Sequence, residues 1–101
     1  MKSVKVTYTV RPEFVEENKA NIRAVMDALK ANPIDGVSYA AFMLDDGATF
    51  VHINLARDDE ALSELTGMEA FKAFQSALRG SDPVAPPSPE AMQLVGANFA
   101  G

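Results

Sequence analysis

Two side chains with chemical potential lie two positions apart in one predicted strand. His52 is the only histidine of the chain, and an imidazole can take up or release a proton near neutral pH. Asn54 follows on the same face of the strand, where its amide can orient a substrate oxygen or stabilise developing negative charge. The spacing predicts a catalytic pair. Two structural interpretations stay open, namely a buried histidine bonded to a neighbouring hydroxyl and an asparagine that ties down a loop.

Residues on neighbouring strands are predicted to line a ligand pocket beside this pair. The threonines of the first strand would supply hydroxyls, although threonine is also common in sheets because its branched Cβ packs well. Tyr39 and Phe42 are alternatives for an aromatic wall, since only one of them can face inward on a regular strand. The predicted ligand-binding residues are Thr7, Thr9, Tyr39, Phe42 and Phe50.

Other kinds of site are not indicated. The chain has no cysteine and a single histidine, whereas transition-metal sites normally collect three or more ligands. The acidic residues at 45–46 and 58–60 suit turns and a helix start without any catalytic role. No phosphate-binding glycine loop or nucleophile elbow is present in the sequence. We therefore predict no metal and no cofactor.

Composition limits the class of protein and of partner. With 101 residues, of which 48% are hydrophobic, the chain suits a single domain over 1–101. A formal net charge of -5 disfavours nucleic acid and anionic membranes as partners. No apolar run reaches the roughly 18 residues of a membrane span, and no signal-peptide pattern opens the chain. We therefore expect a cytoplasmic location.

Hydrophobic periodicity predicts an α+β domain. Alternating β-branched residues predict the first strand, and apolar residues at helical spacing predict two amphipathic helices, the second with a break at Gly67. Asp45-Asp46-Gly47 predicts the turn of a β-hairpin. Residues 80–89 carry four prolines and are predicted to form an extended loop without a ladder. The predicted order is strand 3–10, a helix from 12 to Asn32, strands 37–44 and 49–55, helix 58–79 and strand 92–99.

This β-α-β-β-α-β order is ferredoxin-like. Right-handed crossovers place the first and third strands at the centre of a four-stranded antiparallel sheet, with both helices on one face. We expect the side chains of Val4, Val6, Tyr8, Val51, Ile53 and Leu55 to face the helices. Thr7, Thr9, Phe50, His52 and Asn54 would then face away. That second face is too apolar for bulk water, so we expect a second copy of the chain to close over it around a small cavity.

Several segments carry a family resemblance. They are Arg11-Pro12-Glu13, Gly36-Val37-Ser38-Tyr39, Phe50-Val51-His52-Ile53, Arg57-Asp58-Asp59-Glu60-Ala61 and Phe71-Lys72-Ala73-Phe74. On these segments the chain from Val4 to Leu78 resembles the dimeric α/β-barrel superfamily, and within it the antibiotic biosynthesis monooxygenase-like domains. The resemblance implies ferredoxin-like halves that pair into a barrel. It also implies that some members oxygenate polyphenols or quinols without metal or flavin, while others degrade haem or have no known activity.

The sequence therefore predicts a small homodimeric barrel that binds an aromatic or flat metabolite. One hypothesis is a cofactor-independent monooxygenase, an oxidoreductase in which His52 and Asn54 contact the substrate. The alternatives are a non-catalytic ligand-binding barrel and a purely structural dimer.

Overall fold

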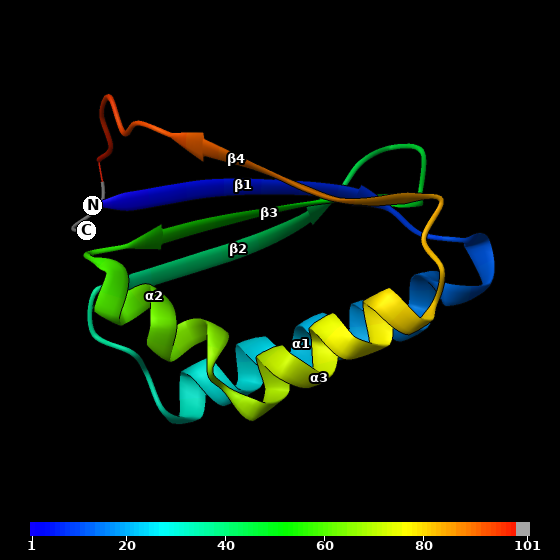
Figure 1. Cartoon of the computed structure of the whole chain (residues 1–101), viewed down its shortest axis with the longest axis horizontal. Coiled ribbons are helices and arrows are strands. Elements are labelled where there is room, and N and C mark those ends of the chain that lie inside the picture. Colours follow the sequence, from blue (N-terminus) through cyan, green and yellow to red (C-terminus); the bar gives the residue numbers. More distant parts are fainter. Residues whose placement is uncertain (99–101) are drawn as a thin grey trace.

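Four strands form one antiparallel sheet, and all the helices cover one of its faces (Figure 1). The computed structural model describes residues 1–98. Its elements are β1 (Lys2–Thr9), a 3-10 turn (Pro12–Phe14), α1 (Val15–Ala31), β2 (Val37–Met43), β3 (Thr49–Ala56), α2 (Asp59–Thr66), α3 (Glu69–Gly80) and β4 (Ala85–Met92). The predicted α+β class, with helices on one face of a four-stranded antiparallel sheet, is confirmed.

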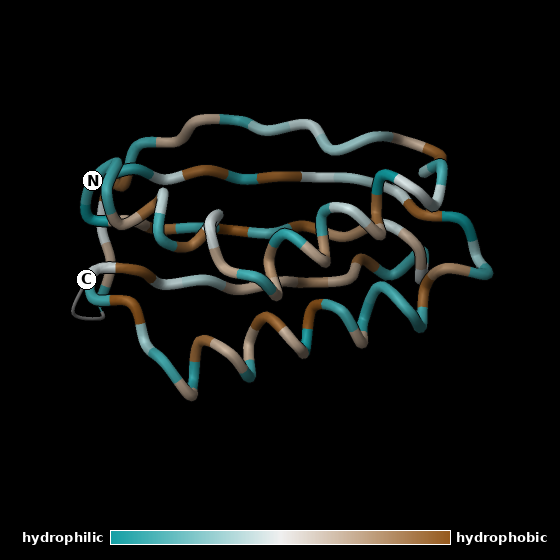
Figure 2. The backbone as a smooth tube through the Cα atoms, turned by 60° about the horizontal axis from the view of Figure 1, so that its bottom comes forward, coloured by the Kyte–Doolittle hydropathy of each residue, from teal (hydrophilic) through white to brown (hydrophobic). Residues whose placement is uncertain are grey.

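The strand order is β2-β3-β1-β4, so β1 and β3 are central as predicted. The helices lie where their apolar faces can be buried, and Figure 2 shows hydrophobic and hydrophilic residues alternating along them. The break between α2 and α3 falls at Gly67, also as predicted. The carboxylate of Asp58 caps α2 by accepting a bond from the Ala61 amide at 2.9 Å.

The C-terminal strand differs from its prediction. β4 spans Ala85–Met92 and contains Pro86, Pro87 and Pro89, whereas the proline segment was predicted as a loop and the strand as 92–99. β4 is an edge strand, and an edge tolerates prolines because half of its backbone groups need no ladder partner. Residues 93–97 form no strand, and Phe99 lies outside the described residues.

The faces of β3 were also predicted wrongly. Tyr8 pairs with Phe50 and Val6 pairs with His52, and directly paired residues point to the same face. Because Tyr8 lies in the core beneath the helices, Phe50, His52 and Asn54 face the helices as well. Val51, Ile53 and Leu55 instead point to the uncovered face. Alternation within a strand shows which residues share a face, but the pairing between strands decides which face that is.

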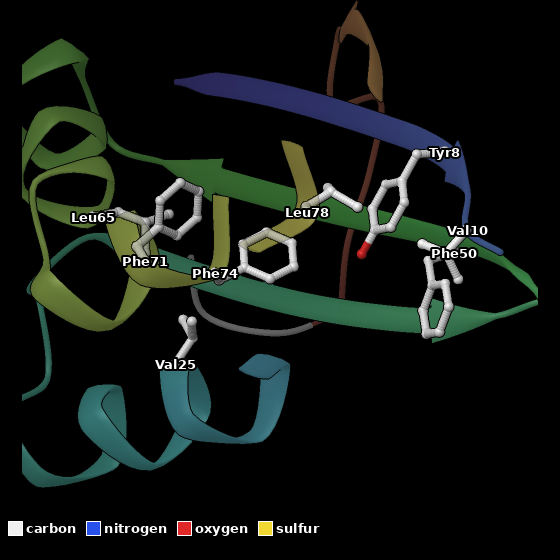
Figure 3. Close-up of a cluster of buried hydrophobic side chains, with 8 residues drawn as sticks. All are labelled: Tyr8, Val10, Val25, Phe50, Leu65, Phe71, Phe74 and Leu78. Carbon is white, nitrogen blue, oxygen red and sulfur yellow. The ribbon is translucent and has the colours of Figure 1, made fainter. Parts of the chain in front are cut away.

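The core fills the layer between the sheet and the helices (Figure 3). Aromatic rings dominate its centre: Tyr8 stacks on Phe50 with ring centroids 5.6 Å apart, and Phe71 meets Phe74 edge to face at 6.0 Å. The Tyr8 hydroxyl points from β1 into this layer. Its buried hydrophobic members are Tyr8, Val10, Val25, Phe50, Leu65, Phe71, Phe74 and Leu78.

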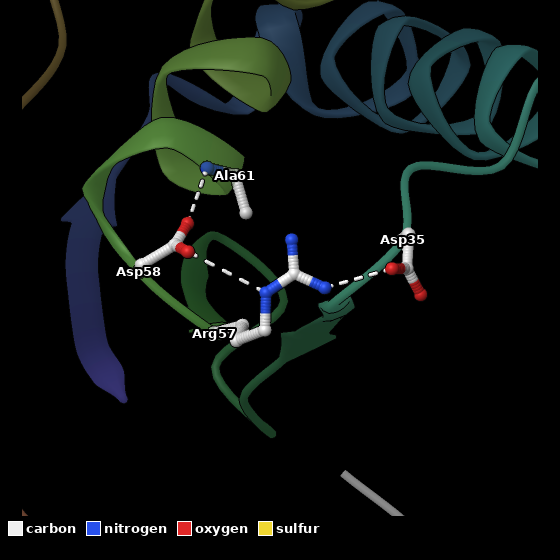
Figure 4. Close-up of polar contacts among 4 residues, drawn as sticks. All are labelled: Asp35, Arg57, Asp58 and Ala61. Carbon is white, nitrogen blue, oxygen red and sulfur yellow. Dashed lines mark hydrogen bonds and ion pairs between the residues drawn. The ribbon is translucent and has the colours of Figure 1, made fainter.

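A surface cluster around Arg57 joins the ends of β2 and β3 (Figure 4). The Arg57 guanidinium donates to Asp35 at 2.7 Å and to Asp58 at 3.4 Å, and these bonds raise the Arg57 pKa. The Arg57 amide also donates to the Gly36 carbonyl at 2.7 Å. Gly36 has φ +80°, and a Cβ there would lie 2.8 Å from the Arg57 Cβ. Glycine is therefore required where the chain enters β2.

Candidate functional site

The candidate site is a cavity of about 400 Å³ between the sheet and α3, called here the α3 cavity. This volume lies within the range of roughly 300–1,000 Å³ that small-molecule sites occupy. Its walls are mainly apolar and aromatic, with the polar groups of β2 and β3 on the sheet side. The lining residues are Val6, Tyr8, Tyr39, His52, Asn54, Phe71, Phe74, Gln75, Leu78, Arg79, Pro86 and Pro87.

His52 lies between two tyrosine hydroxyls. Tyr8 Oη is 2.7 Å from His52 Nε2, and Tyr39 Oη is 2.5 Å from His52 Nδ1. Asn18 of α1 extends the series, because its Nδ2 donates to Tyr8 Oη at 2.9 Å. The imidazole also stacks on the ring of Phe74, with centroids 5.2 Å apart. This series of Asn18, Tyr8, His52 and Tyr39 is called here the buried chain.

Burial sets the protonation states of the three titratable side chains in the buried chain, namely His52, Tyr8 and Tyr39. His52 is 3% exposed, and desolvation lowers its pKa to about 4. Burial raises the pKa of Tyr8 to about 12, partly offset by the bond from Asn18. Burial also raises the pKa of Tyr39, and the nearby Tyr8 adds to that increase. Near neutral pH the buried chain therefore consists of neutral hydrogen-bonding groups.

Asn54 is a second polar group of the cavity wall. It is 8% exposed, and its Oδ1 has no hydrogen-bond partner within residues 1–98. A buried carbonyl oxygen without a partner is costly, so this atom is suited to accept a bond from a ligand. Tyr39 is paired directly with Asn54 across β2 and β3, which places both side chains on the helix-covered face.

Arg79 contributes the cationic group among the lining residues. It is exposed, as is Gln75, which also lines the cavity. Within the part of the chain that the structure describes, Arg79 forms no ion pair. The guanidinium is therefore free to meet the solvent-facing end of a bound molecule.

The structure brings together three of the seven predicted site residues. His52, Asn54 and Tyr39 line the α3 cavity, and Tyr39 rather than Phe42 is the aromatic residue of β2 that faces inward. Phe50 shares the face but lies in the core, stacked on Tyr8 outside the cavity wall.

The other three residues lie on the opposite face of the sheet. Thr7 pairs with Val51, and Thr9 bonds Thr49 through hydroxyls 2.8 Å apart. Phe42 pairs with Val51 and is 52% exposed. The prediction that these side chains share one cavity with His52 is therefore wrong, for the same reason as the face assignment of β3.

The sequence analysis missed Tyr8 and Asn18, although each left a signal. Asn18 is a polar residue within the helical stripe of Val15, Ile22 and Val25, and a polar residue in such a stripe needs a buried partner. Tyr8 carries a hydroxyl on the face of the first strand where Val4 and Val6 precede it. Phe71, Phe74 and Arg79 were not assigned to the site, because only the packing of α3 on the sheet brings them to it.

Comparison with known proteins gives a match at the level of fold. No family sequence model matches the chain, and no curated protein sequence matches it significantly. Among solved structures, an antibiotic biosynthesis monooxygenase superimposes with a TM-score of 0.80 at 18% identity, covering 95% of this chain and all of that one. The chain has the fold of that structure. The resemblance predicted from the sequence is confirmed at this level.

Two bacterial proteins provisionally given the same name show the same fold. The one from Caulobacter crescentus has a TM-score of 0.79 at 22% identity and covers 94% of this chain and 90% of its own. The one from Bacteroides thetaiotaomicron has a TM-score of 0.83 at 14% identity, with coverages of 99% and 94%. The fold is therefore shared along nearly the whole chain.

Two further observations concern metals and membranes. Within residues 1–98, no three side chains of His, Cys, Asp or Glu gather as metal ligands would. None of the described helices combines the length and the apolar character that crossing a bilayer requires.

Proposed function

We propose that the α3 cavity binds a flat aromatic metabolite that carries a phenolic hydroxyl. The observation that carries this proposal is an apolar cavity of about 400 Å³ with Tyr39 and Asn54 together on its sheet wall. The rings of Phe71 and Phe74 would pack against the ligand ring. Tyr39, supported by His52, and Asn54 would contact the ligand oxygen.

We further propose that the bound phenol is oxygenated by dioxygen without a cofactor, as the fold resemblance suggests. The electron-rich ring would give two electrons to dioxygen at the carbon para to the hydroxyl. One C–O bond forms there, and the phenolic proton passes to the outer oxygen, giving a hydroperoxide. Loss of the ring C–H proton and cleavage of the O–O bond then yield a quinone and one water. The Tyr39 hydroxyl would stabilise the negative charge that develops on the phenol oxygen.

The test uses 1-naphthol, whose para carbon carries a hydrogen, and its ether 1-methoxynaphthalene. Binding is followed by fluorescence, and products are analysed after incubation under ¹⁸O₂. We expect 1-naphthol to bind and to yield 1,4-naphthoquinone with one labelled oxygen. Tyr39→Phe should reduce both the binding of 1-naphthol and the yield of quinone. Thr7→Val, on the opposite face, should leave both quantities unchanged. Failure of 1-naphthol to bind would refute the proposal.

A non-catalytic binding protein is the second candidate. The low pKa of His52 favours it, since a weakly basic imidazole is a poor acceptor for a phenolic proton. Recovery of bound 1-naphthol unaltered after incubation in air would select this function.

We also propose that a second copy of the chain covers the helix-free face of the sheet, called here the open face. Val51, Ile53 and Leu55 project there, together with Phe42 at 52% and Met92 at 37% exposure. These apolar side chains share the open face with Thr7 and the Lys5–Glu90 ion pair, and exposed apolar side chains gathered on one face of a sheet are typical of an interface. The protein would then be a homodimer. Its cytoplasmic location stays a prediction.

Light scattering after gel filtration tests the dimer. We expect twice the chain mass of 10.8 kDa at micromolar concentration. Ile53→Glu should give the monomer, because it places a charge at the centre of the open face. Val84→Glu is the control, since Val84 is 61% exposed and precedes β4. A monomeric wild-type protein would contradict the proposal.

A further inference from the structure

The direction of hydrogen bonding along the buried chain is determined at the end farthest from the cavity. Asn18 is fully buried, is absent from the cavity lining, and donates through Nδ2 to Tyr8 Oη at 2.9 Å. Its Oδ1 has no partner among the described residues. The amide therefore acts on the site only as a donor to Tyr8.

A neutral imidazole has one N–H and one lone pair, so it donates to one tyrosine and accepts from the other. Asn18 occupies a lone pair of Tyr8 Oη, and His52 Nε2 is the only other atom bonded to that oxygen within residues 1–98. The Tyr8 proton is therefore best satisfied by pointing at Nε2, because a buried hydroxyl proton without an acceptor is unfavourable.

With Asn18 Nδ2 donating to Tyr8 Oη, the opposite direction would leave the Tyr8 proton unpaired. If His52 carried its proton on Nε2, Tyr8 Oη would accept from both Asn18 and His52, and the proton of this 2% exposed residue would have no acceptor among residues 1–98. With the proton on Nδ1, His52 donates to Tyr39 at 2.5 Å, and the Tyr39 proton is released toward the cavity. A ligand can accept that proton.

We propose that Asn18 is a positioning residue that holds His52 in the Nδ1–H tautomer and thereby presents Tyr39 to the ligand as a hydrogen-bond donor. Asn54, paired with Tyr39 across the sheet, presents an unpartnered acceptor on the same face. A neutral phenolic hydroxyl, which accepts one bond and donates another, complements this pair. This ligand preference rests on the proposed function, whereas the tautomer does not.

The tautomer is measured by ¹⁵N NMR on ligand-free protein labelled at histidine, near pH 7.5. His52 is the sole histidine, so the imidazole nitrogen signals can be attributed to it without mutating other histidines. We expect the shift of a protonated nitrogen at Nδ1 and that of an unprotonated nitrogen at Nε2 in the wild type. An Nε2–H tautomer in the wild type would overturn the proposal.

Two variants separate the roles of Asn18 and Tyr39, which lie at the two ends of the buried chain. Asn18→Leu removes the donor to Tyr8 while keeping the side-chain size, so the two ¹⁵N shifts should move toward each other as the tautomers mix. Tyr39→Phe should keep the Nδ1–H tautomer, because Tyr8 still donates to Nε2. If Tyr39→Phe shifts the tautomer and Asn18→Leu does not, Tyr39 controls it and the proposal fails. Should Asn18→Leu not fold, the wild type and Tyr39→Phe decide.

Ligand preference is tested separately with the same two probes. We expect 1-naphthol to bind at least 10-fold more tightly than 1-methoxynaphthalene, because the ether cannot donate to Asn54. Asn54→Leu should remove most of that difference. Equal affinities would refute the ligand preference, and absence of binding by both would refute the proposed function while leaving the tautomer result intact.

Discussion

Acidification from pH 6.5 to 5 should destabilise the protein through His52. Burial lowers the His52 pKa from 6.5 to about 4, so the folded state binds a proton less readily than the unfolded chain. The stabilisation is fully present above pH 6.5 and is lost as the pH falls from 6.5 to about 4. The full difference corresponds to about 3 kcal/mol, of which about 2 kcal/mol should be lost by pH 5.

Urea unfolding at pH 7.5, 6.5, 5.5 and 5.0 measures this effect. The protein concentration must be held constant, because the midpoint of a dimer depends on it. The window is selective, since no other histidine is present and Asp46 and Asp58 have pKa values lowered below their ordinary range by hydrogen bonds. His52→Gln is the control, because it keeps a neutral polar side chain and should show almost no pH dependence in this window.

Two results would refute the reasoning. One is a wild-type free energy of unfolding that stays constant between pH 7.5 and 5.0. The other is an equal decrease in wild type and His52→Gln, which would assign the effect to other groups. A direct NMR titration of the His52 ring protons should place the midpoint near 4, and a midpoint near 6.5 would show that the imidazole is solvated.

Three further substitutions test the packing around the site, each by urea unfolding at pH 7.5. Tyr8→Phe should cost about 1–3 kcal/mol, because the partners of the lost hydroxyl stay buried; a neutral result would mean that water replaces it. Gly36→Ala should cost about 1–3 kcal/mol from its positive φ and its contact with the facing arginine, whereas Gly80→Ala, with open space around its Cβ, should stay within about 0.5 kcal/mol. Leu65→Ala should cost about 2–5 kcal/mol because Leu65 is fully buried, while the 48% exposed Leu94 should tolerate alanine. Equal effects of the two glycine substitutions would contradict the crowding assigned to Gly36, and equal effects of the two leucine substitutions would contradict the burial assigned to Leu65.

The amino-acid sequence determined the helices and the first three strands because their signals are local, whereas β4 formed in the proline segment that was predicted as a loop. The alternation in β1, the stripe of α1, the Asp46-Gly47 turn and the break at Gly67 depend on residues a few positions apart. The central place of β1 and β3 also followed, since the handedness of crossovers constrains the topology. His52, Asn54 and Tyr39 could be chosen because side chains of their types occur in a strand pattern.

Tertiary structure alone decided where the site lies. His52 is a polar residue that faces the helices, and this orientation is stable only because hydroxyls from β1 and β2 meet its two nitrogens. Those partners are 44 and 13 residues away, so no local pattern reveals them. The same pairing register turned Thr7 and Phe42 to the open face and placed the cavity under α3. Strand register is a property of paired strands, and a single strand's alternation carries no record of it.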